Sequence, residues 1–211
     1  MNPNTNTLNR IRYGLYAPFY DRVVRRLDAG RRRSIALTAP QAGEHILIVG
    51  AGTGLDFPYL PEGLHVTAVD LSATMLRQAE RHTDMVPFKL TCRVMDAQVL
   101  DLPTAAFDVV FLHLILAVVP DPQAAIREVA RVVRPGGRVG IFDKFLPADA
   151  TPSPGRRLVG AFANVIFSDI NRKLEPLLDE AGLILQRQEP SLFGGVFKVA
   201  LATRPEQQHK P

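Results

Sequence analysis

Short apolar runs along the chain alternate with stretches in which apolar residues recur at helical spacing. The apolar runs, rich in Val, Ile and Leu, predict strands at 45–50, 65–70, 88–95, 107–113 and 138–143. The helical spacing predicts helices at 19–38, 72–82, 122–133 and 170–181. Because strands and helices take turns, the pattern is typical of an α/β fold with a doubly wound, mostly parallel sheet.

The C-terminal part of the chain breaks this alternation. Two apolar runs, at 183–188 and 196–203, flank Phe193-Gly194-Gly195 and predict a hairpin. We therefore expect one antiparallel edge strand on an otherwise parallel sheet. Upstream, Ser72 is a good N-cap for the helix after it, and Pro135-Gly136-Gly137 is expected to end the helix before the last parallel strand.

Length and composition favour one domain over residues 1–211, because 46% apolar content in a chain of this length suffices for one full core. The single cysteine, Cys92, excludes a disulfide framework and favours a reducing, cytoplasmic compartment. No apolar core follows the first charges, so we expect no secretory signal. The longest apolar run, at 109–119, is too short to span a bilayer.

The net charge of +4 is unevenly distributed. Residues 1–33 contain eight arginines against Asp21 and Asp28, a net charge of +6, whereas the remaining 178 residues carry a net charge of −2. Such asymmetry indicates an anionic partner, either lipid or nucleic acid.

The predicted helix that begins near residue 19 is amphipathic. Apolar residues at 19, 20, 23, 24 and 27 share one face, and Arg22, Arg25 and Arg26 lie on the other. An apolar face beside arginines is what an interfacial helix needs. We expect residues 1–38 to form a basic arm or lid on an anionic membrane surface, with the protein peripheral at the inner face of the membrane.

A glycine-rich loop carries the clearest chemical signal. The apolar run Ile46-Leu47-Ile48-Val49 leads into Gly50-Ala51-Gly52-Thr53-Gly54, and Asp70 ends the next apolar run 20 residues after Gly50. Glycines let the backbone approach a ligand, and a carboxylate at the tip of the second strand can accept both hydroxyls of a ribose. Leu55 occupies the third-glycine position of the dinucleotide motif, and no Gly-Lys-Ser/Thr follows, so S-adenosylmethionine remains the candidate.

These residues resemble the class I S-adenosylmethionine-dependent methyltransferases. Further matches are Asp96, where the family contacts the adenine amino group, and the run Asp108-Val109-Val110-Phe111 at the fourth strand. The resemblance implies a Rossmann-like, seven-stranded sheet and S-adenosylhomocysteine as product. It implies cofactor contacts from Gly50, Ala51, Gly52, Thr53, Gly54, Asp70, Leu71, Met75, Asp96, Ala97 and His113.

Within that class the chain is most similar to bacterial phospholipid N-methyltransferases, which convert phosphatidylethanolamine to phosphatidylcholine. The local matches are Gly54-Leu55-x-x-Pro58, the run Leu116-Ala117-Val118-Val119-Pro120-Asp121-Pro122, and the basic N-terminal helix with Tyr20-Asp21. One departure is Ile48, where the family usually has an acid that helps to hold the methionine end of the cofactor. Backbone carbonyls near Gly50 and His113 are candidates to replace it.

Methylation of a lipid amine requires loss of a proton before attack, and three residues are candidates to assist. His113 ends the fourth predicted strand, Asp143 ends the fifth, and Tyr20 lies in the helix that would close over the site. We expect residues 147–181, which include Arg156 and Arg157, to cover the acceptor pocket and to contact a lipid phosphate. No metal site is expected, because Asp143 lacks a companion Asp-Asn pair.

Three other functions stay open at this point. The first is methylation of a quinone or a soluble small molecule, and the second is methylation of nucleic acid. The Asn/Asp-Pro-Pro-Tyr type of sequence that serves exocyclic base amines is absent after Phe111, where Leu112-His113-Leu114-Ile115 stands, so we expect no nucleic-acid partner. The third is cofactor binding without catalysis, which the substitution at Ile48 raises.

Overall fold

A computed structural model describes residues 27–145, 173–192 and 196–206. Its helices are α2 (Asp28–Thr38), α3 (Ala73–Glu80), α4 (Pro122–Val132) and α6 (Leu174–Glu180), with a short 3₁₀ helix η2 (Phe57–Tyr59). Its strands are β1 (His45–Val49), β2 (His65–Asp70), β3 (Lys89–Val94), β4 (Phe107–His113), β5 (Val133–Lys144), β6 (Ile184–Pro190) and β7 (Phe197–Thr203). No helix within these ranges is long and apolar enough to cross a membrane.

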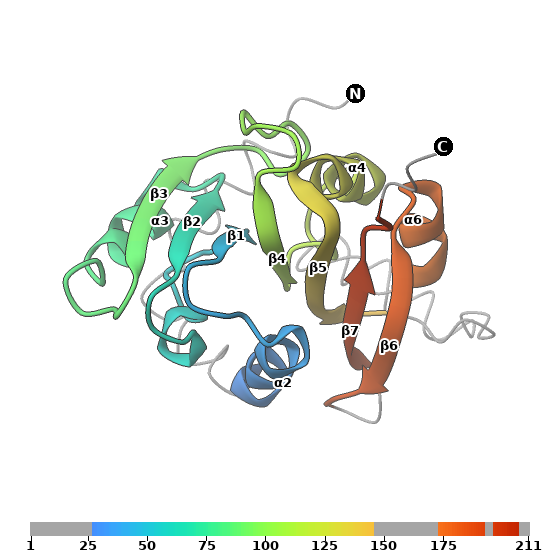
Figure 1. Ribbon diagram of the computed structural model, residues 1–211, viewed down its shortest axis with the longest axis horizontal. Coiled ribbons are helices and arrows are strands. Elements are labelled where there is room, and N and C mark those ends of the chain that lie inside the picture. Colours follow the sequence, from blue (N-terminus) through green and yellow to red (C-terminus); the bar gives the residue numbers. More distant parts are fainter. Residues whose placement is uncertain (1–26, 146–172, 193–195, 207–211) are drawn as a thin grey trace, which may run out of the picture.

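The strands form one seven-stranded sheet in the order β3-β2-β1-β4-β5-β7-β6 (Figure 1). The first five of these strands are parallel, and β7 runs antiparallel to β5 and to the outermost strand β6. The expected α/β fold is confirmed, including the C-terminal antiparallel pair. Pro135-Gly136-Gly137 does not end the helix, because α4 has already ended at Val132 and β5 begins at Val133. These three residues lie inside β5, where its pairing with β4 is irregular.

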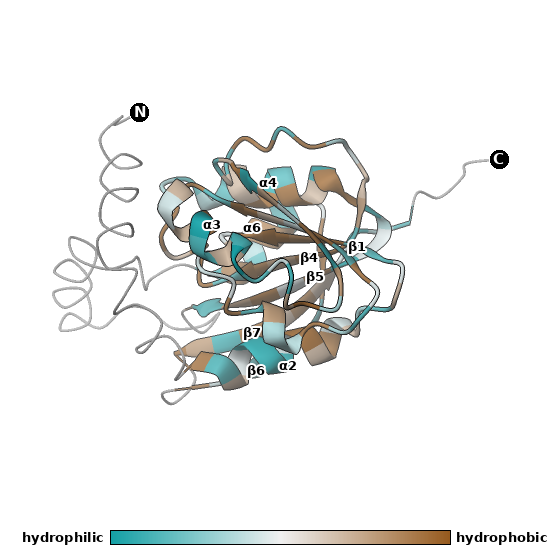
Figure 2. Cartoon of the chain, turned by 90° about the vertical axis from the view of Figure 1, so that its left-hand side faces the viewer, coloured by the Kyte–Doolittle hydropathy of each residue, from teal (hydrophilic) through white to brown (hydrophobic). Residues whose placement is uncertain are grey.

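Apolar residues fill both faces of the sheet. The helix α4 is capped by Asp121, whose side chain accepts a hydrogen bond from Ala124 N at 2.9 Å. Its residues Ala125, Ile126 and Val129 pack against one face of the sheet together with α6. On the other face, Ile35 of α2 packs with Ile46 and Phe57. Figure 2 shows α2 and α4 on opposite sides of the strands, with the hydrophobic residues concentrated between them.

The helix α2 lies unusually close to the sheet. A Cβ atom on Gly30 would lie 2.2 Å from Cε2 of Phe142 in β5, so only glycine fits there. A Cβ on Gly140 would likewise lie 2.9 Å from Oγ of Ser34. These two glycines bring α2 near the carboxyl ends of β4 and β5, which places its polar residues beside the loops that end those strands.

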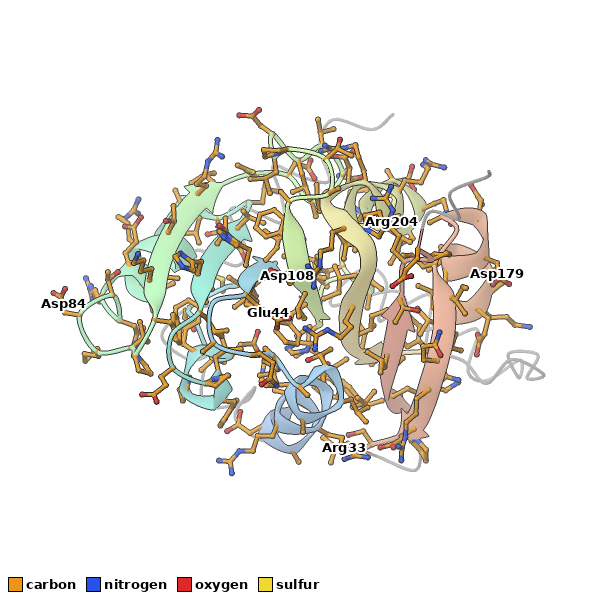
Figure 3. All side chains as sticks on the ribbon, in the orientation of Figure 1. Arg33, Glu44, Asp84, Asp108, Asp179 and Arg204 are labelled. Atoms are coloured by element: carbon orange, nitrogen blue, oxygen red, sulfur yellow. The ribbon has the colours of Figure 1, made fainter. Side chains whose placement is uncertain are left out.

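The opposite edge of the sheet, where the parallel strands begin, carries paired charges. Glu44 forms an ion pair with Arg138, and Asp108 pairs with Arg134 at 2.8 Å while accepting a hydrogen bond from His45 N at 2.7 Å. Glu44 and Asp108 are labelled side by side in Figure 3. Because these charges have protein partners, the edge is a structural region of the molecule.

Candidate cofactor site

A cleft lies across the carboxyl ends of the parallel strands, where ligands bind in doubly wound sheets. It has a volume of about 890 Å³ including its open mouth. Its lining comes from the ends of β1 to β4, from the β4–α4 loop (residues 114–121) and from α2. The lining residues are Arg31, Val49, Gly50, Ala51, Gly52, Thr53, Leu55, Val69, Asp70, Leu71, Ser72, Met75, Met95, Asp96, Ala97, His113, Leu114, Ile115, Val118, Val119 and Pro120.

The glycine loop (residues 50–54) lines the cleft with its first four residues. Gly50 has φ of 76°, a left-handed conformation that favours glycine, and its N–H donates to Val69 O at 2.8 Å. A Cβ on Gly50 would lie 2.8 Å from Cδ1 of Ile115. The loop and Ile115 therefore make two adjoining walls with no room for a larger residue at position 50.

Asp70 stands at the end of β2 with both carboxylate oxygens oriented by the backbone. Oδ2 accepts a hydrogen bond from Gly52 N at 2.9 Å, and Oδ1 accepts one from Ser72 N at 2.8 Å. Burial raises the pKa of this carboxyl, and the backbone donors at Ser72, Gly52 and Leu71 oppose that rise. A carboxylate only accepts hydrogen bonds, so Asp70 suits the paired hydroxyls of a ribose.

Asp96 follows β3 at the far end of the cleft. Its Oδ1 accepts hydrogen bonds at 2.9 Å from both the backbone N and the side-chain Nε2 of Gln98. Gln98 Oε1 in turn accepts a hydrogen bond from Asp121 N at 3.0 Å, which connects this carboxylate to the start of α4. Asp96 is thus held in place at the position that the resemblance assigns to adenine.

The other end of the cleft holds a buried group of four polar residues, which we call the arginine–histidine network: Arg31, Ser34, Asp56 and His113. His113 Nδ1 lies 2.8 Å from Asp56 Oδ1, and His113 Nε2 lies 2.9 Å from Ser34 Oγ. Arg31 Nη1 donates to the same Asp56 Oδ1 at 3.0 Å. Both ring nitrogens of His113 therefore have protein partners.

Asp56 is ionised within this network although its side chain is buried. Burial alone would raise the pKa of the carboxyl, but electrostatic attraction to His113 and Arg31 and the hydrogen bonds from both outweigh it, and the net pKa lies well below the ordinary value of 3.8. A carboxylate is only an acceptor, so the hydrogen on His113 between the two groups sits on Nδ1. Nε2 then faces the Ser34 hydroxyl.

Asp143 lies behind the cleft and does not line it. Its Oδ2 accepts a hydrogen bond from Ala117 N at 3.1 Å, and its Oδ1 accepts one from Lys144 N at 2.8 Å. Burial raises the pKa of this carboxyl, and the hydrogen bonds from Lys144 and Ala117 oppose the rise. Leu114 N donates to Phe142 O at 2.7 Å, so the β4–α4 loop is fastened to the tip of β5 at two points.

The structure brings together nearly all residues expected to contact the cofactor. Gly54 is the exception, because it packs against Phe57, where a Cβ would lie 2.5 Å from Cε2 of that ring. Ile48 is 1% exposed and belongs to the apolar layer between the sheet and α2. Tyr20, Arg22, Arg25, Arg26, Arg156 and Arg157, together with most of the 147–181 segment, lie outside the described residues.

Three members of the network were missed in the sequence: Arg31, Ser34 and Asp56. Arg31 was counted with the exposed basic arm because it precedes Arg32 and Arg33. The helical spacing of the sequence could have identified Arg31, because Arg31, Ser34, Ile35 and Thr38 fall on one face of α2. All four residues are buried. Asp56 gave no such signal, because its partners lie in distant parts of the sequence.

Known proteins resemble the chain in sequence and in fold. A family described as "Methyltransferase domain" matches residues 47–141. A phosphatidylethanolamine N-methyltransferase from Cereibacter sphaeroides is 31% identical over 84% of this chain and 89% of that protein. The chain belongs to the class I S-adenosylmethionine-dependent methyltransferases.

Two further relatives extend the comparison. A ubiquinone biosynthesis O-methyltransferase from Coxiella burnetii is 33% identical over 46% of this chain and 42% of that protein. A solved structure, Haemonchus contortus phosphoethanolamine N-methyltransferase 2 in complex with S-adenosyl-L-methionine, superposes with a TM-score of 0.68 at 18% identity, covering 83% of this chain and 52% of that one. The expected enzyme class and cofactor are confirmed by these matches taken together.

The residues present in the cleft fit S-adenosylmethionine. Asp70 presents a carboxylate to which ribose hydroxyls can donate, the glycine loop leaves space for close approach, and apolar Met75 and Val119 also line the cleft. When bound, this cofactor supplies a methyl group already activated by a sulfonium. Among the described residues no cluster of three or more His, Cys, Asp or Glu side chains could hold a metal ion.

Proposed function

We propose that this methyltransferase transfers methyl groups to the amine of a membrane phospholipid, converting phosphatidylethanolamine to its N-methylated forms and phosphatidylcholine. The observation that carries the proposal is the 31% identity to a phosphatidylethanolamine N-methyltransferase over 84% of the chain. The basic N-terminal arm supports it, because eight arginines within residues 1–33 favour an anionic surface.

For this class of reaction the main task of the protein is to align the methyl donor with the amine. Methyl transfer from a sulfonium is an in-line displacement, so the enzyme contributes chiefly by holding donor and amine in register and by excluding water. The glycine loop and Asp70 would hold the donor, with the β4–α4 loop as a fixed wall beside it. The amine attacks only as the neutral base, so a proton must leave it first.

Tyr20, His113 and Asp143 remain our candidates for assisting that proton loss. His113 lines the cleft, but its Nε2 can take a proton from an amine only after the contact with Ser34 opens. Asp143 would likewise have to give up backbone hydrogen bonds and gain access to the cleft. A pH profile of kcat for His113→Asn distinguishes the roles, because loss of a base removes the acidic limb, whereas loss of a positioning group lowers kcat at every pH.

The acceptor is tested directly by a methyl-transfer assay. Purified protein is incubated with S-adenosylmethionine and vesicles that contain phosphatidylethanolamine and an anionic lipid, and the lipids are analysed for successive mass increases of 14. We expect mono-, di- and trimethylated products, and much less product with Asp70→Ala at a low concentration of S-adenosylmethionine. Absence of lipid products alongside methylation of a quinone precursor would refute the phospholipid proposal.

Peripheral binding at the inner face of the membrane is a separate part of the proposal. Changing Arg22, Arg25 and Arg26 to Glu should abolish sedimentation with anionic vesicles, since each arginine near such a surface contributes about 1 kcal/mol. A control variant with the same change in net charge replaces Arg77, Arg81 and Lys89 by Glu. All three are exposed: Arg77 lies in α3, Arg81 follows α3, and Lys89 begins β3. Equal loss in both variants would indicate a general effect of net charge.

Quinone methylation is the second candidate function, favoured by the match to the ubiquinone biosynthesis O-methyltransferase. A quinone acceptor carries a hydroxyl or a ring carbon as nucleophile and has no phosphate. Under this alternative, the same assay with a demethylated quinone precursor gives product, and the vesicles need no phosphatidylethanolamine.

A further inference from the structure

Arg31 is a buried cation of the cleft whose hydrogen-bond donors are not all satisfied by the residues that the structure describes. It is 5% exposed and lines the cleft from α2. Its Nη1 donates to Asp56, but its Nε is buried and has no hydrogen-bond partner anywhere in the described chain. A buried donor without an acceptor is costly to the folded state, especially on a charged group, so its persistence needs an explanation.

The position of Arg31 along the cleft indicates what would satisfy it. Asp70 and Asp96 end β2 and β3, on one side of β1, whereas His113 ends β4 on the other side. Arg31 is tied to the His113 side through Asp56. A donor whose ribose lies at Asp70 and whose adenine lies at Asp96 extends its amino-acid end toward this side.

Ile48 stands where the family usually has an acidic residue that helps to hold the methionine end of the cofactor. Ile48 is packed into the apolar layer and does not line the cleft, so no side chain at that position reaches the cofactor. A free amino acid end carries a carboxylate as well as an ammonium, and guanidinium is the side chain best suited to a carboxylate. The arginine–histidine network therefore holds a guanidinium where it could bind the carboxylate of the amino-acid end.

We propose that Arg31 binds the carboxylate of the methionine end of S-adenosylmethionine, and that Asp56 with His113 and Ser34 positions it. Asp56 fixes Nη1 of Arg31 and is itself fixed by His113, which Ser34 orients. The guanidinium is thus held in one orientation before the cofactor arrives, and its buried Nε still lacks an acceptor among the described residues. Asp56 offsets part of the buried positive charge while the cleft is empty.

An anionic phosphate on the acceptor is the other group that could satisfy Arg31. The two sources are separable because one belongs to the donor and one to the acceptor. S-adenosylhomocysteine carries the carboxylate, and 5′-methylthioadenosine has the same nucleoside and sulfur without the amino-acid end. Their difference in affinity measures the interaction with that end alone.

The test is calorimetric titration of both compounds into the wild-type protein, Arg31→Met and Arg33→Met. Arg33 is the matched control, because it lies on the same helix but pairs with Glu189 outside the cleft. We expect Arg31→Met to weaken S-adenosylhomocysteine binding by about 30-fold, which is about 2 kcal/mol, and 5′-methylthioadenosine binding by less than twofold. Arg33→Met should change neither.

Circular dichroism checks that Arg31→Met folds, since it leaves Asp56 with one charged partner fewer. If it does not fold, Arg31→Lys keeps the charge beside Asp56 but lacks Nε, and it should still weaken S-adenosylhomocysteine selectively. Equal weakening of both compounds, or of neither, would overturn the proposal. A rise in KM for a short-chain phosphatidylethanolamine with unchanged S-adenosylhomocysteine binding would assign Arg31 to the acceptor phosphate instead. Because the titrations contain no acceptor, they stand even if the phospholipid proposal fails.

Discussion

The two ends of the cleft are built in different ways. At the β2–β3 end, Asp70 and Asp96 are oriented by neighbours close in sequence, such as Ser72 and Gln98 at two positions away. At the β4 end, each bond of the arginine–histidine network joins distant segments: Arg31 and Asp56 are 25 residues apart, Asp56 and His113 are 57 apart, and Ser34 and His113 are 79 apart. The first end forms once two strands pair, and the second requires the packed domain.

This difference has an energetic consequence. The carboxylates at the β2–β3 end accept hydrogen bonds from backbone N–H groups in part-buried surroundings, so we expect the fold to tolerate changes there. A buried network joined across the fold couples ligand binding to stability, since the loss of one member leaves another charged or polar group without a partner. We therefore expect substitutions at the β4 end to alter both folding and cofactor binding, and those at the β2 end to alter chiefly binding.

The largest expected effect is from Asp56→Asn, which should cost about 3–5 kcal/mol of unfolding free energy at pH 7, because it leaves the Arg31 charge buried beside a neutral amide. The folded-state pKa of Asp56 lies below its ordinary value of 3.8, so its contribution is complete above about pH 4 and declines as the pH falls through the range below it. The difference between wild type and variant should therefore be smaller at pH 3 than at pH 7.

Urea unfolding at the two pH values measures this difference. The control is Asp101→Asn, whose side chain is 95% exposed in its pair with Arg93, and which should change stability little at either pH. A stability gap for Asp56→Asn that does not depend on pH would show that the ionised carboxylate is not what the network needs.

The next effect is from Gly30→Ala, which changes no residue of the cleft. The new methyl would overlap the Phe142 ring, so α2 must move outward at a cost of about 1–3 kcal/mol. Because Arg31 follows Gly30, the shift should also weaken S-adenosylhomocysteine binding. The double variant with Phe142→Leu should recover part of both losses, and additive losses in thermal unfolding and calorimetry would argue against this coupling.

Asp70→Ala sharpens the comparison from the β2 end. We expect binding of S-adenosylhomocysteine and of 5′-methylthioadenosine to weaken alike, by at least tenfold or about 1.4 kcal/mol, because both contain the ribose. Calorimetry on both compounds gives the answer. A selective effect on S-adenosylhomocysteine would place the amino-acid end at Asp70 and reverse the orientation that we infer.

The smallest effect is expected from Arg33→Met. Arg33 is nearly half exposed, and its bonds to Glu189 connect α2 with β6 at the surface (Figure 3). Its removal should change the unfolding free energy little, since solvent screens such pairs. A loss in urea unfolding as large as that of Asp56→Asn would mean that surface charges, and not the buried network, hold α2 in place.

Much of the fold followed from the sequence because its cues are local. The predicted strands at 65–70 and 107–113 coincide with β2 and β4, since each is an apolar run bounded by turns. The helix after Ser72 begins where expected because the Ser72 side chain accepts a hydrogen bond from Met75 N at 3.4 Å. The glycine loop and Asp70 both line the cleft, as expected, because the carboxyl ends of neighbouring parallel strands lie at the same edge of a sheet.

The arginine–histidine network could not be predicted in the same way. A run of three arginines, Arg31-Arg32-Arg33, looks uniform in the sequence, yet the helix turns Arg31 inward and Arg33 toward Glu189. Asp56 sits in a short turn whose position depends on the packing of η2 against α2. His113 was identified as a cleft residue by its strand, but its partners depended on the close approach that Gly30 and Gly140 allow.

The fastening of the β4–α4 loop by Asp143 has a consequence for the kinetics of the enzyme. A wall that is already ordered spares an incoming donor the entropy of arranging that loop, so association should resemble docking to a rigid surface. Turnover would then be limited by movement elsewhere or by release of product. The buried acid at the tip of β5 would then influence the rate of cofactor association through the loop that it holds in place.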